Sequence, residues 1–207
     1  MRCILDNFAC LFSSTVNLVF MTPATPKFTR DQLVNYLELL NRELEKMGVT
    51  GEICIVGGAA MVLGFGNRGS TRDIDALLIS PASIRAAIQR VAAQENLSPS
   101  WLNDGAKGFA SSQPVEFRQL MKMSCLRIIS PPAEYILAMK CIAARVGIDE
   151  NDKADARFLI QRLKLQDAAA VLAVAAKYYD AKRIPAKTQY FIQEICDELA
   201  RPPQDIE

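Results

Sequence analysis

The sequence predicts an α+β fold in which helices pack on a small mixed β-sheet and the C-terminal part is helical. Up to about residue 130, short apolar segments bounded by glycine, proline or serine alternate with amphipathic segments. From Pro131 onward the apolar residues keep helical spacing. The chain has 207 residues, of which 50% are hydrophobic, so it can bury a sizeable core. Strands mixed with helices, followed by helices alone, are typical of this fold class.

We therefore divide the chain into a flexible N-terminal tail (1–27), an α/β core (28–130) and a helical C-terminal part (131–207). The apolar run at 8–20 is shorter than the about 20 residues that a membrane-spanning helix needs, and no signal-peptide cleavage site follows it. We expect no membrane association. Met21 is an alternative to Met1 as the true translation start.

The first helix is expected to begin at Thr29, because Thr29 and Gln32 form a capping-box pattern before a run of leucines with helical spacing. Gly48 would end this helix as a C-cap. A short strand at 52–57 and a short helix at 59–66 should follow.

The next strand is expected at 73–80. Side chains alternate between the two faces of a strand, so Ile74 and Ala76 should point to one side, and Asp73 and Asp75 to the other. The two carboxylates would then share a face, with their Cα atoms about 6 to 7 Å apart.

The rest of the chain continues this alternation before becoming helical. Pro81 would start a helix that runs to about Gln94, and residues 96–113 are rich in turn formers and predict a long loop. The segments "VEFRQL" and "CLRIIS" resemble strands. Helices are then expected at about 132–146, 152–164, 167–179 and 187–200.

Histidine is absent from the sequence. This absence excludes a Ser-His-Asp triad, a Cys-His pair and histidine-bearing zinc sites, so any catalysis would use carboxylates, lysine, arginine, hydroxyls and a hard metal ion. The net charge of +1 gives no general reason for nucleic-acid binding, which would need a local basic patch. Six cysteines without a Cys-x-x-Cys pair indicate reduced thiols in a cytoplasmic protein.

The Asp73 and Asp75 pair suits a divalent metal ion. Mg²⁺ takes oxygen ligands, with one or two carboxylates and the remainder from water and substrate phosphates. Such ions orient a nucleoside triphosphate for in-line displacement. An Asp-x-Asp at the start of a strand is also typical of a solvated edge or a turn cap.

The glycines at 57 and 58 would let backbone N–H groups and a helix N-terminus approach a phosphate. Arg68, Ser70 and Thr71 precede the aspartates, where a guanidinium group and hydroxyls would hold phosphate oxygens. Taken alone, Gly-Gly after a strand more often marks close packing of helix on strand.

Together, the strand, Gly-Gly, short helix, Arg, Ser-Thr and Asp-x-Asp resemble the polymerase-beta-type nucleotidyltransferase superfamily. The segment "GGAAMVLGFGNRGSTRDIDALL" is similar to bacterial nucleotidyltransferase-like proteins related to the toxins of type IV abortive-infection systems. The later segment "LRIISPPAEYILAMKCIAARVGIDENDKADARFLIQRL" is similar to that group's strand, Ser-Pro, lysine-bearing helix and acidic helix. The likeness covers roughly residues 50–165.

This resemblance implies roles for residues in the first half of the site. Gly57 and Gly58 would face the phosphates, with Ser70 and Thr71 beside the triphosphate. The resemblance also implies that Asp73 and Asp75 bind Mg²⁺.

The resemblance implies further site residues in the C-terminal part. Lys140 would face the nucleotide phosphates, and one of Asp152 and Asp155 would complete the active site. On the residues alone, Lys140 is equally a surface lysine with a buried stem, and Asp152 an ordinary acid at a helix N-terminus.

The implied activity is Mg²⁺-dependent transfer of a nucleoside monophosphate from a nucleoside triphosphate to an acceptor. The acceptor would be the 3′ end of a tRNA or other RNA, or a protein hydroxyl, and the protein would act as a toxin held by a cognate antitoxin. The alternative is a catalytically inactive module of the same fold that binds a nucleotide, an RNA or a partner protein. It is motivated by the lack of an acid in "SCLRIIS", which leaves Glu116 as the only candidate for a third carboxylate on a strand.

The loop segment "WLNDGAKGF" would cover this site. Lys107 would then contact phosphate. Trp101 either stacks on a base or, as the interpretation we favour, anchors the loop on the core.

Overall fold

The structure, a computed structural model, describes residues 27–80, 82–144 and 150–201, without the side chains of residues 78–80 and 183. The predictions for the tail, including residues 8–20 and Met21, and for Pro81 lie outside these residues. The sheet part contains, in order, β1 (Phe28–Thr29), α1 (Arg30–Lys46), β2 (Gly51–Ile55), α2 (Gly57–Ala60), η1 (Met61–Phe65), β3 (Ser70–Thr71), β4 (Ile74–Ser80), α3 (Ala82–Gln94), β5 (Leu102–Asn103), η2 (Gly105–Phe109), β6 (Arg118–Lys122) and β7 (Leu126–Ser130). The helices that follow are α4 (Ala133–Ala143), α5 (Glu150–Arg162), α6 (Ala168–Tyr178), η3 (Ala181–Arg183) and α7 (Ala186–Ala200).

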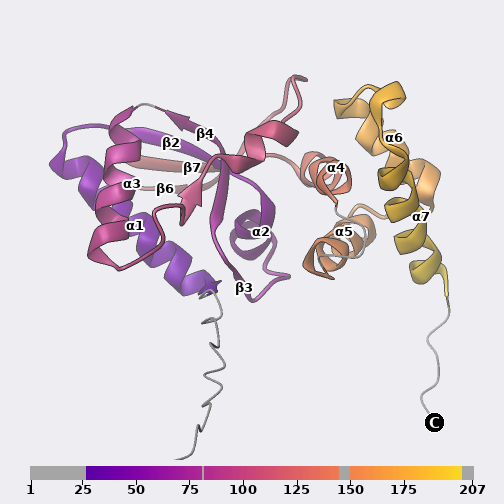
Figure 1. Cartoon of the computed structure of the whole chain (residues 1–207), viewed down its shortest axis with the longest axis horizontal. Helices are drawn as coiled ribbons and strands as arrows, with labels where there is room; N and C mark the ends of the chain where they lie inside the picture. The colour runs from indigo at the N-terminus through magenta and orange to yellow at the C-terminus, as the bar shows by residue number, and fades with distance from the viewer. Residues whose placement is uncertain (1–26, 81, 145–149, 202–207) are drawn as a thin grey trace, which may run out of the picture.

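The main sheet is mixed, with strand order β5-β4-β2-β7-β6 (Figure 1). The central strand β2 is antiparallel to β4 and parallel to β7, while β5 is parallel to β4 and β6 is antiparallel to β7. Strands β1 and β3 form a separate antiparallel pair. The predicted α+β class, with a mixed sheet and a helical C-terminal part, is confirmed.

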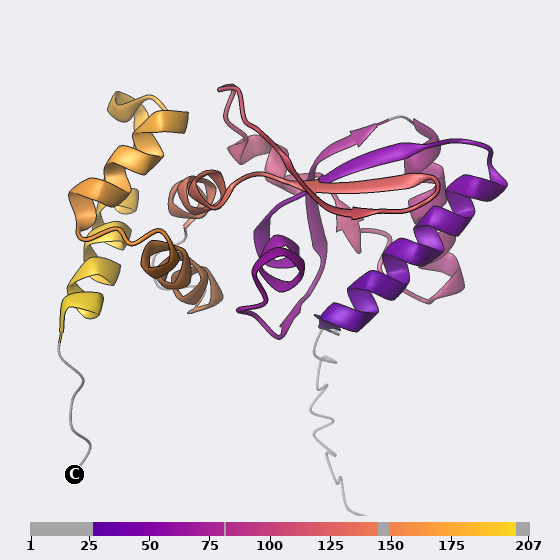
Figure 2. The ribbon, with the colours of Figure 1, turned by 180° about the vertical axis from the view of Figure 1, so that it is seen from behind.

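One face of the sheet is covered by α1 and α3, which lie together under it in Figures 1 and 2. Helix α1 forms because a capping box closes its start: the Thr29 N–H donates to Gln32 Oε1 at 2.9 Å, and the Gln32 N–H donates to Thr29 Oγ1 at 3.4 Å. Gly48 follows its end with a φ of 65°, a left-handed conformation that glycine adopts readily. The buried face of α1 consists of leucines at helical spacing: Leu33, Leu37, Leu40 and Leu44.

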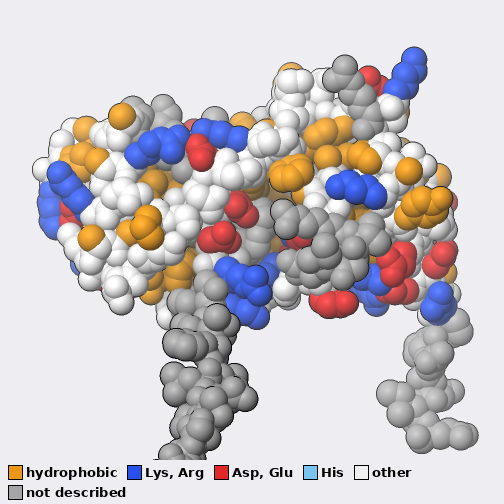
Figure 3. Space-filling view, viewed as in Figure 1, with side chains coloured by type: hydrophobic (Ala, Val, Ile, Leu, Met, Phe, Trp, Pro, Cys, Tyr) orange, Lys and Arg blue, Asp and Glu red, His pale blue; other side chains and the backbone are white. Residues whose placement is uncertain are grey.

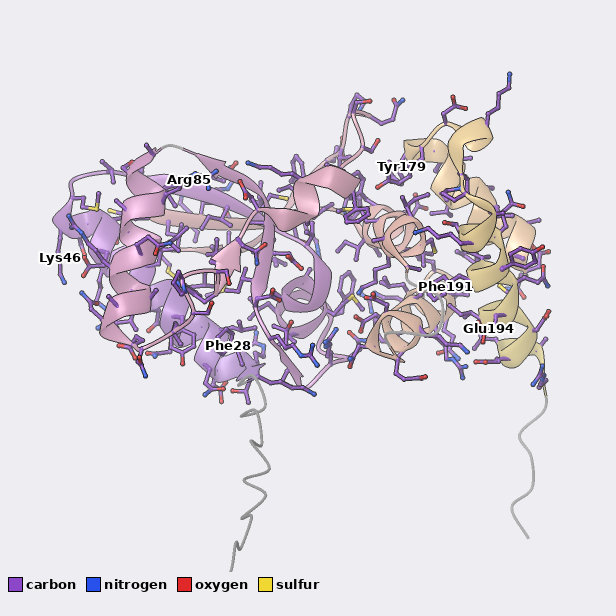
Figure 4. All side chains as sticks on the ribbon, in the orientation of Figure 1. Phe28, Lys46, Arg85, Tyr179, Phe191 and Glu194 are labelled. Carbon is purple, nitrogen blue, oxygen red and sulfur yellow. The ribbon has the colours of Figure 1, made fainter. Side chains whose placement is uncertain are left out.

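The helices α4 to α7 stand beyond one end of the sheet, next to α2 (Figures 1 and 2). Ala60 and Met61 lie in one apolar cluster with buried residues of α4, α5, α6 and α7, so the helix after the glycines joins the sheet part to the helical part. Phe191 of α7 is buried in the same cluster and is labelled in Figure 4. Burial of this apolar surface favours docking of the two parts.

Two local predictions are wrong. The segment "VEFRQL" was expected as a strand over 115–120, but β6 begins only at Arg118, which pairs with Ser130. The next residue after Ser130 is Pro131, which has no N–H to donate, so the ladder ends there and Val115 to Phe117 have no partner strand. The predicted loop at 96–113 contains β5 and η2, elements too short for a periodic signal.

Across the described residues, the helices are all too short or too polar to pass through a lipid bilayer.

Candidate active site

The predicted aspartate pair lies at the start of β4. Ile74 and Ala76 are buried in the cluster under α1 and α3, while Leu77 belongs to the cluster on the other face, with residues of α4. Asp73, directly before the strand, and Asp75 therefore face α4, which confirms the prediction that they share a side.

Gly57 begins the helix after β2, directly against Asp75. Its φ is 59°, and a Cβ atom at this position would lie 2.8 Å from Asp75 Oδ2. The strand and the helix are tied here as well, because the Val56 N–H donates to the Asp75 carbonyl at 2.9 Å. Glycine is therefore required at 57 both by its backbone conformation and by the carboxylate beside it.

Gly58 is required for a different contact. A Cβ atom there would lie 2.4 Å from Thr71 Oγ1, and the buried Thr71 fills the space that a side chain would occupy. Ser70 and Thr71 form β3 and pair with β1. Arg68 donates from Nε to the Ser70 carbonyl at 2.8 Å. Of the three predicted phosphate ligands, Thr71 and Arg68 therefore lie against Gly58 at the start of α2, whereas Ser70 is linked to them through its carbonyl group.

Lys140 is buried on α4, with 6% of its surface exposed, so the interpretation as a surface lysine is wrong. Its Nζ lies 2.8 Å from Asp155 Oδ2 and 3.0 Å from Asp152 Oδ1, both on α5. Asp155 Oδ2 also lies 3.0 Å from Arg68 Nη1. The side chain of Asp155 is 3% exposed and that of Asp152 is 34% exposed. Asp155 is therefore a buried acceptor for two cations, whereas Asp152 is partly open to solvent.

A pocket of about 350 Å³ lies between the sheet and α4. Four predicted site residues line it: Gly57, Asp75, Lys140 and Asp152. The remaining wall is mostly apolar and comes from Val56, Gly105, Ala106, Phe109, Met139 and Ala143. The other predicted site residues lie beside the pocket but do not line it: Gly58, Arg68, Ser70, Thr71, Asp73 and Asp155. Figure 3 shows acidic and basic side chains gathered in the middle of the molecule, between the sheet part and the helices.

Burial and the neighbouring charge of Asp73 raise the pKa of Asp75 to about 6. Lys140 opposes this rise in the pKa of Asp75, but its ammonium group is already paired with Asp155 and Asp152. Burial also raises the pKa of Asp73, against a hydrogen bond from Asn103 Nδ2 to Asp73 Oδ2 at 3.4 Å. Two adjacent carboxylates with raised pKa values form a site whose negative charge lacks full compensation.

This donor set fits Mg²⁺. Within the described residues, no three Asp, Glu, Cys or His side chains gather as metal ligands. Mg²⁺ needs only one or two protein carboxylates when phosphates and water complete its octahedron. Asp73 and Asp75 supply this number of hard oxygen ligands, and burial raises the pKa of both carboxyls, an effect that a cation bound between them would oppose.

The loop after β5 forms one wall of the pocket, as predicted, through Gly105, Ala106 and Phe109. Trp101 does not stack on a ligand: it is 1% exposed, and its Nε1 donates to the Ile88 carbonyl at 3.2 Å, which confirms it as an anchor. Lys107 is exposed and forms an ion pair with Asp104 at 2.7 Å.

Glu116 is exposed and precedes β6, so it supplies no strand carboxylate. Strand β7 carries no acid either. The second carboxylate that lines the pocket, beside Asp75, is Asp152, which comes from the helical part.

Several contacts around the site were not predicted. Asn103 lies opposite Asp75 in the parallel pair of β5 with β4 and donates to Asp73, but a two-residue strand leaves no periodic signal. The loop carrying η2 is held from the helical part by tyrosines. Tyr179 donates to the Phe109 carbonyl at 2.6 Å, and Tyr135 accepts from the Ser111 N–H at 2.8 Å. Tyr179 is labelled in Figure 4, at the end of α6 nearest this loop.

Comparison of the chain with protein-family models, curated proteins and solved structures finds no match. The function is therefore inferred from the geometry of the pocket and from the residues that line it.

Proposed function

We propose that this protein is a Mg²⁺-dependent nucleotidyltransferase that transfers a nucleoside monophosphate from a nucleoside triphosphate to an acceptor hydroxyl. The observation that carries the proposal is the position of Asp75. Its carboxylate lies against Gly57 at the start of a helix, in the same pocket as Lys140 and Asp152. Carboxylates for a metal ion, a helix start without side chains and a buried lysine are the groups that a triphosphate needs around it.

In this proposal, Mg²⁺ bound by Asp73 and Asp75 would neutralise the phosphates and orient the α-phosphate. Gly57 lets the Asp75 carboxylate approach the start of the helix, so that a metal ion held by Asp75 would lie beside the backbone N–H groups that bind phosphate oxygens. Lys140 donates to a phosphate, and Asp155 holds its ammonium group in place.

The acceptor oxygen forms a bond to the α-phosphorus, the bond to the β-phosphate oxygen breaks, and pyrophosphate leaves. Asp152 accepts the proton of the acceptor hydroxyl, a role that its partial exposure within the pocket supports. The cytoplasm is the proposed compartment. The described cysteines Cys54, Cys125, Cys141 and Cys196 form no disulfides, which is consistent with reducing surroundings.

The test supplies the protein with Mg²⁺, each α-labelled nucleoside triphosphate in turn, and tRNA, mixed RNA or protein as acceptor. Label should enter one acceptor class and should be lost on chelation of Mg²⁺. The variant Asp73→Asn/Asp75→Asn should lose transfer by at least about 100-fold, since it removes the metal ligands. Asp31→Asn, at an exposed position in the first turn of α1, is the matched control and should keep full activity.

The second candidate is an inactive module that binds nucleotide without turnover. It is favoured by the lack of an acid on β7 and by the exposed position of Glu116. Calorimetry with a non-hydrolysable nucleotide separates the two functions. Mg²⁺-dependent affinity with transfer supports the enzyme, affinity without transfer to any acceptor supports the module, and no affinity contradicts both.

A toxin role, with activity held by a cognate antitoxin, is the biological form of the enzyme that we propose. Induced expression of the wild-type chain should arrest growth, and the Asp75→Asn chain should not. Equal arrest by both chains at equal protein levels would contradict a role for this site.

A further inference from the structure

A second charged site surrounds Phe65, at the end of η1. The guanidinium carbon of Arg118 lies 4.6 Å from the centre of the Phe65 ring, and that of Arg162 lies 5.4 Å from it. Phe158 contacts the same ring edge-on, with 6.2 Å between ring centres. The two arginines come from β6 and from the end of α5, so three segments far apart in the sequence meet here.

The position of Arg118 is specified by the backbone. Its Nη2 donates to the Gly64 carbonyl at 3.2 Å. A Cβ atom at Gly64 would lie 2.6 Å from the same Nη2, so a side chain there would displace the Arg118 guanidinium group from this carbonyl. The Arg118 guanidinium is thus held in one orientation over Phe65, as a preformed donor group.

Neither arginine has an acidic partner among the residues that the structure describes. Arg118 Nε is buried and makes no hydrogen bond there. Burial, followed by the charge of Arg162, lowers the pKa of Arg118 below its usual value. Two neighbouring cations that have no counterion within the described part of the chain, one of them with an unpaired buried donor, are stabilised when an acceptor of negative charge joins them.

The chemistry of this site selects an oxyanion. Guanidinium groups bind phosphate oxygens through paired N–H donors. A nucleobase is a poor occupant, because the Phe65 ring is already covered by the arginines.

The site also lies at a defined separation from the pocket. Phe65 is eight residues beyond Gly57 in one continuous helical segment, α2 followed by the π-helical turn η1. Arg162 is seven residues beyond Asp155 on α5, which is roughly 10 Å. Phe65 and Arg162 are therefore each about two helical turns beyond a residue at or beside the pocket, a separation that a strand of a few nucleotides can span.

We infer that Arg118 and Arg162 bind the phosphodiester backbone of a nucleic-acid strand whose end reaches the pocket. The inference rests on the proposed function only in that the strand end in the pocket would be the acceptor of the nucleoside monophosphate. Binding of the strand itself needs no turnover.

The test is anisotropy of a labelled single-stranded RNA of mixed sequence with the full chain, without nucleotide, between 50 and 200 mM KCl. Arg162→Gln should weaken binding about tenfold, and the slope of log affinity against log salt should fall by about 1. Arg157→Gln is the matched control on the same helix. Arg157 is paired with Glu198, which keeps Lys153 as a second partner, so binding should change less than about twofold.

Arg118→Lys tests the second arginine, with the thermal midpoint measured alongside because Arg118 is partly buried. It should also weaken binding, since lysine lacks the planar fork. Unchanged binding by Arg162→Gln, an equal loss in Arg157→Gln, or absence of RNA binding at 50 mM KCl would overturn the inference. The inference would also be overturned if the chain bound inorganic phosphate through Arg162 but did not bind RNA. If the wild-type chain binds RNA but transfers no nucleotide to any acceptor, the proposed function alone would be overturned.

Discussion

Asp155 Oδ2 lies 2.8 Å from Lys140 Nζ, and both side chains are nearly inaccessible to solvent. The same oxygen lies 3.0 Å from Arg68 Nη1. One carboxylate of α5 therefore fixes a lysine of α4 and an arginine of the loop before β3. The contact between the sheet part and the helical part is thus polar at this point, and it is also where the candidate active site begins.

Asp155→Asn should lower the free energy of unfolding by about 3 kcal/mol, because it leaves the partly buried Arg68 without a carboxylate and the buried Lys140 with only the partly exposed Asp152. Asp152→Asn should lower it by less than about 1 kcal/mol, since Asp152 is partly exposed and Lys140 keeps Asp155. Urea unfolding followed by the fluorescence of Trp101, the only tryptophan, measures both. Equal losses would contradict the assignment of Asp155 as the buried member of the pair.

Asp75→Asn should stabilise the protein at pH 7 by about 1 to 2 kcal/mol when Mg²⁺ is chelated. The folded-state pKa of Asp75 is raised to about 6 from its ordinary value of 3.8. The wild type therefore has its full stability from this group below pH 3.8 and loses it as the pH rises through 6. The gain from the substitution should disappear at about pH 4. A variant less stable than wild type at pH 7 would contradict this prediction.

Gly57→Ala should lower the free energy of unfolding by about 3 kcal/mol, since alanine has both an unfavourable φ and a clash with Asp75 there. Gly66→Ala is the matched control. Gly66 has a similar φ of 68° with nothing within 4 Å of the added Cβ, so about 1 kcal/mol is expected. The difference between the two variants measures the close approach to Asp75. Chemical denaturation gives both values, and equal values would show that the approach has no energetic consequence.

Tyr179→Phe should loosen the loop that carries η2, because it removes the hydrogen bond to the Phe109 carbonyl. The expected loss of stability is about 1 kcal/mol, with faster amide hydrogen exchange confined to residues 105–111. Tyr190→Phe, at a side chain 73% exposed, is the control and should leave exchange unchanged. Unaltered exchange in Tyr179→Phe would show that the other loop contacts suffice to hold the pocket wall.

Sequence periodicity predicted the parts of the fold that repeat over many residues. The capping box at Thr29, the leucine face of α1 and the side shared by Asp73 and Asp75 all follow from local rules, and all are confirmed. The pairing of β5 with β4 did not follow, because two residues carry no period and their place depends on the free edge of β4.

The site was predicted in part for the same reason. Gly57 directly follows β2 and Asp75 lies near the start of β4, and the antiparallel pairing of these neighbouring strands brings the two residues together. The sequence alone did not distinguish Asp152 from Asp155, since both lie on one helix near Lys140. Only the docking of α5 buries one of them against Arg68 and leaves the other in the pocket. Long-range packing decides this, and local patterns do not contain it.

The pocket takes one wall from the sheet part, through Gly57 and Asp75, and another from the helices, through Lys140 and Asp152. A ligand that fills it contacts both parts at once, so its binding energy adds to their docking energy. By thermodynamic linkage the reverse also holds. A substitution in the distant helix interface, for example at the buried Phe191, would lower the affinity for the ligand although Phe191 does not line the pocket. The affinity of this pocket is therefore also a measure of how firmly the two parts of the chain are joined.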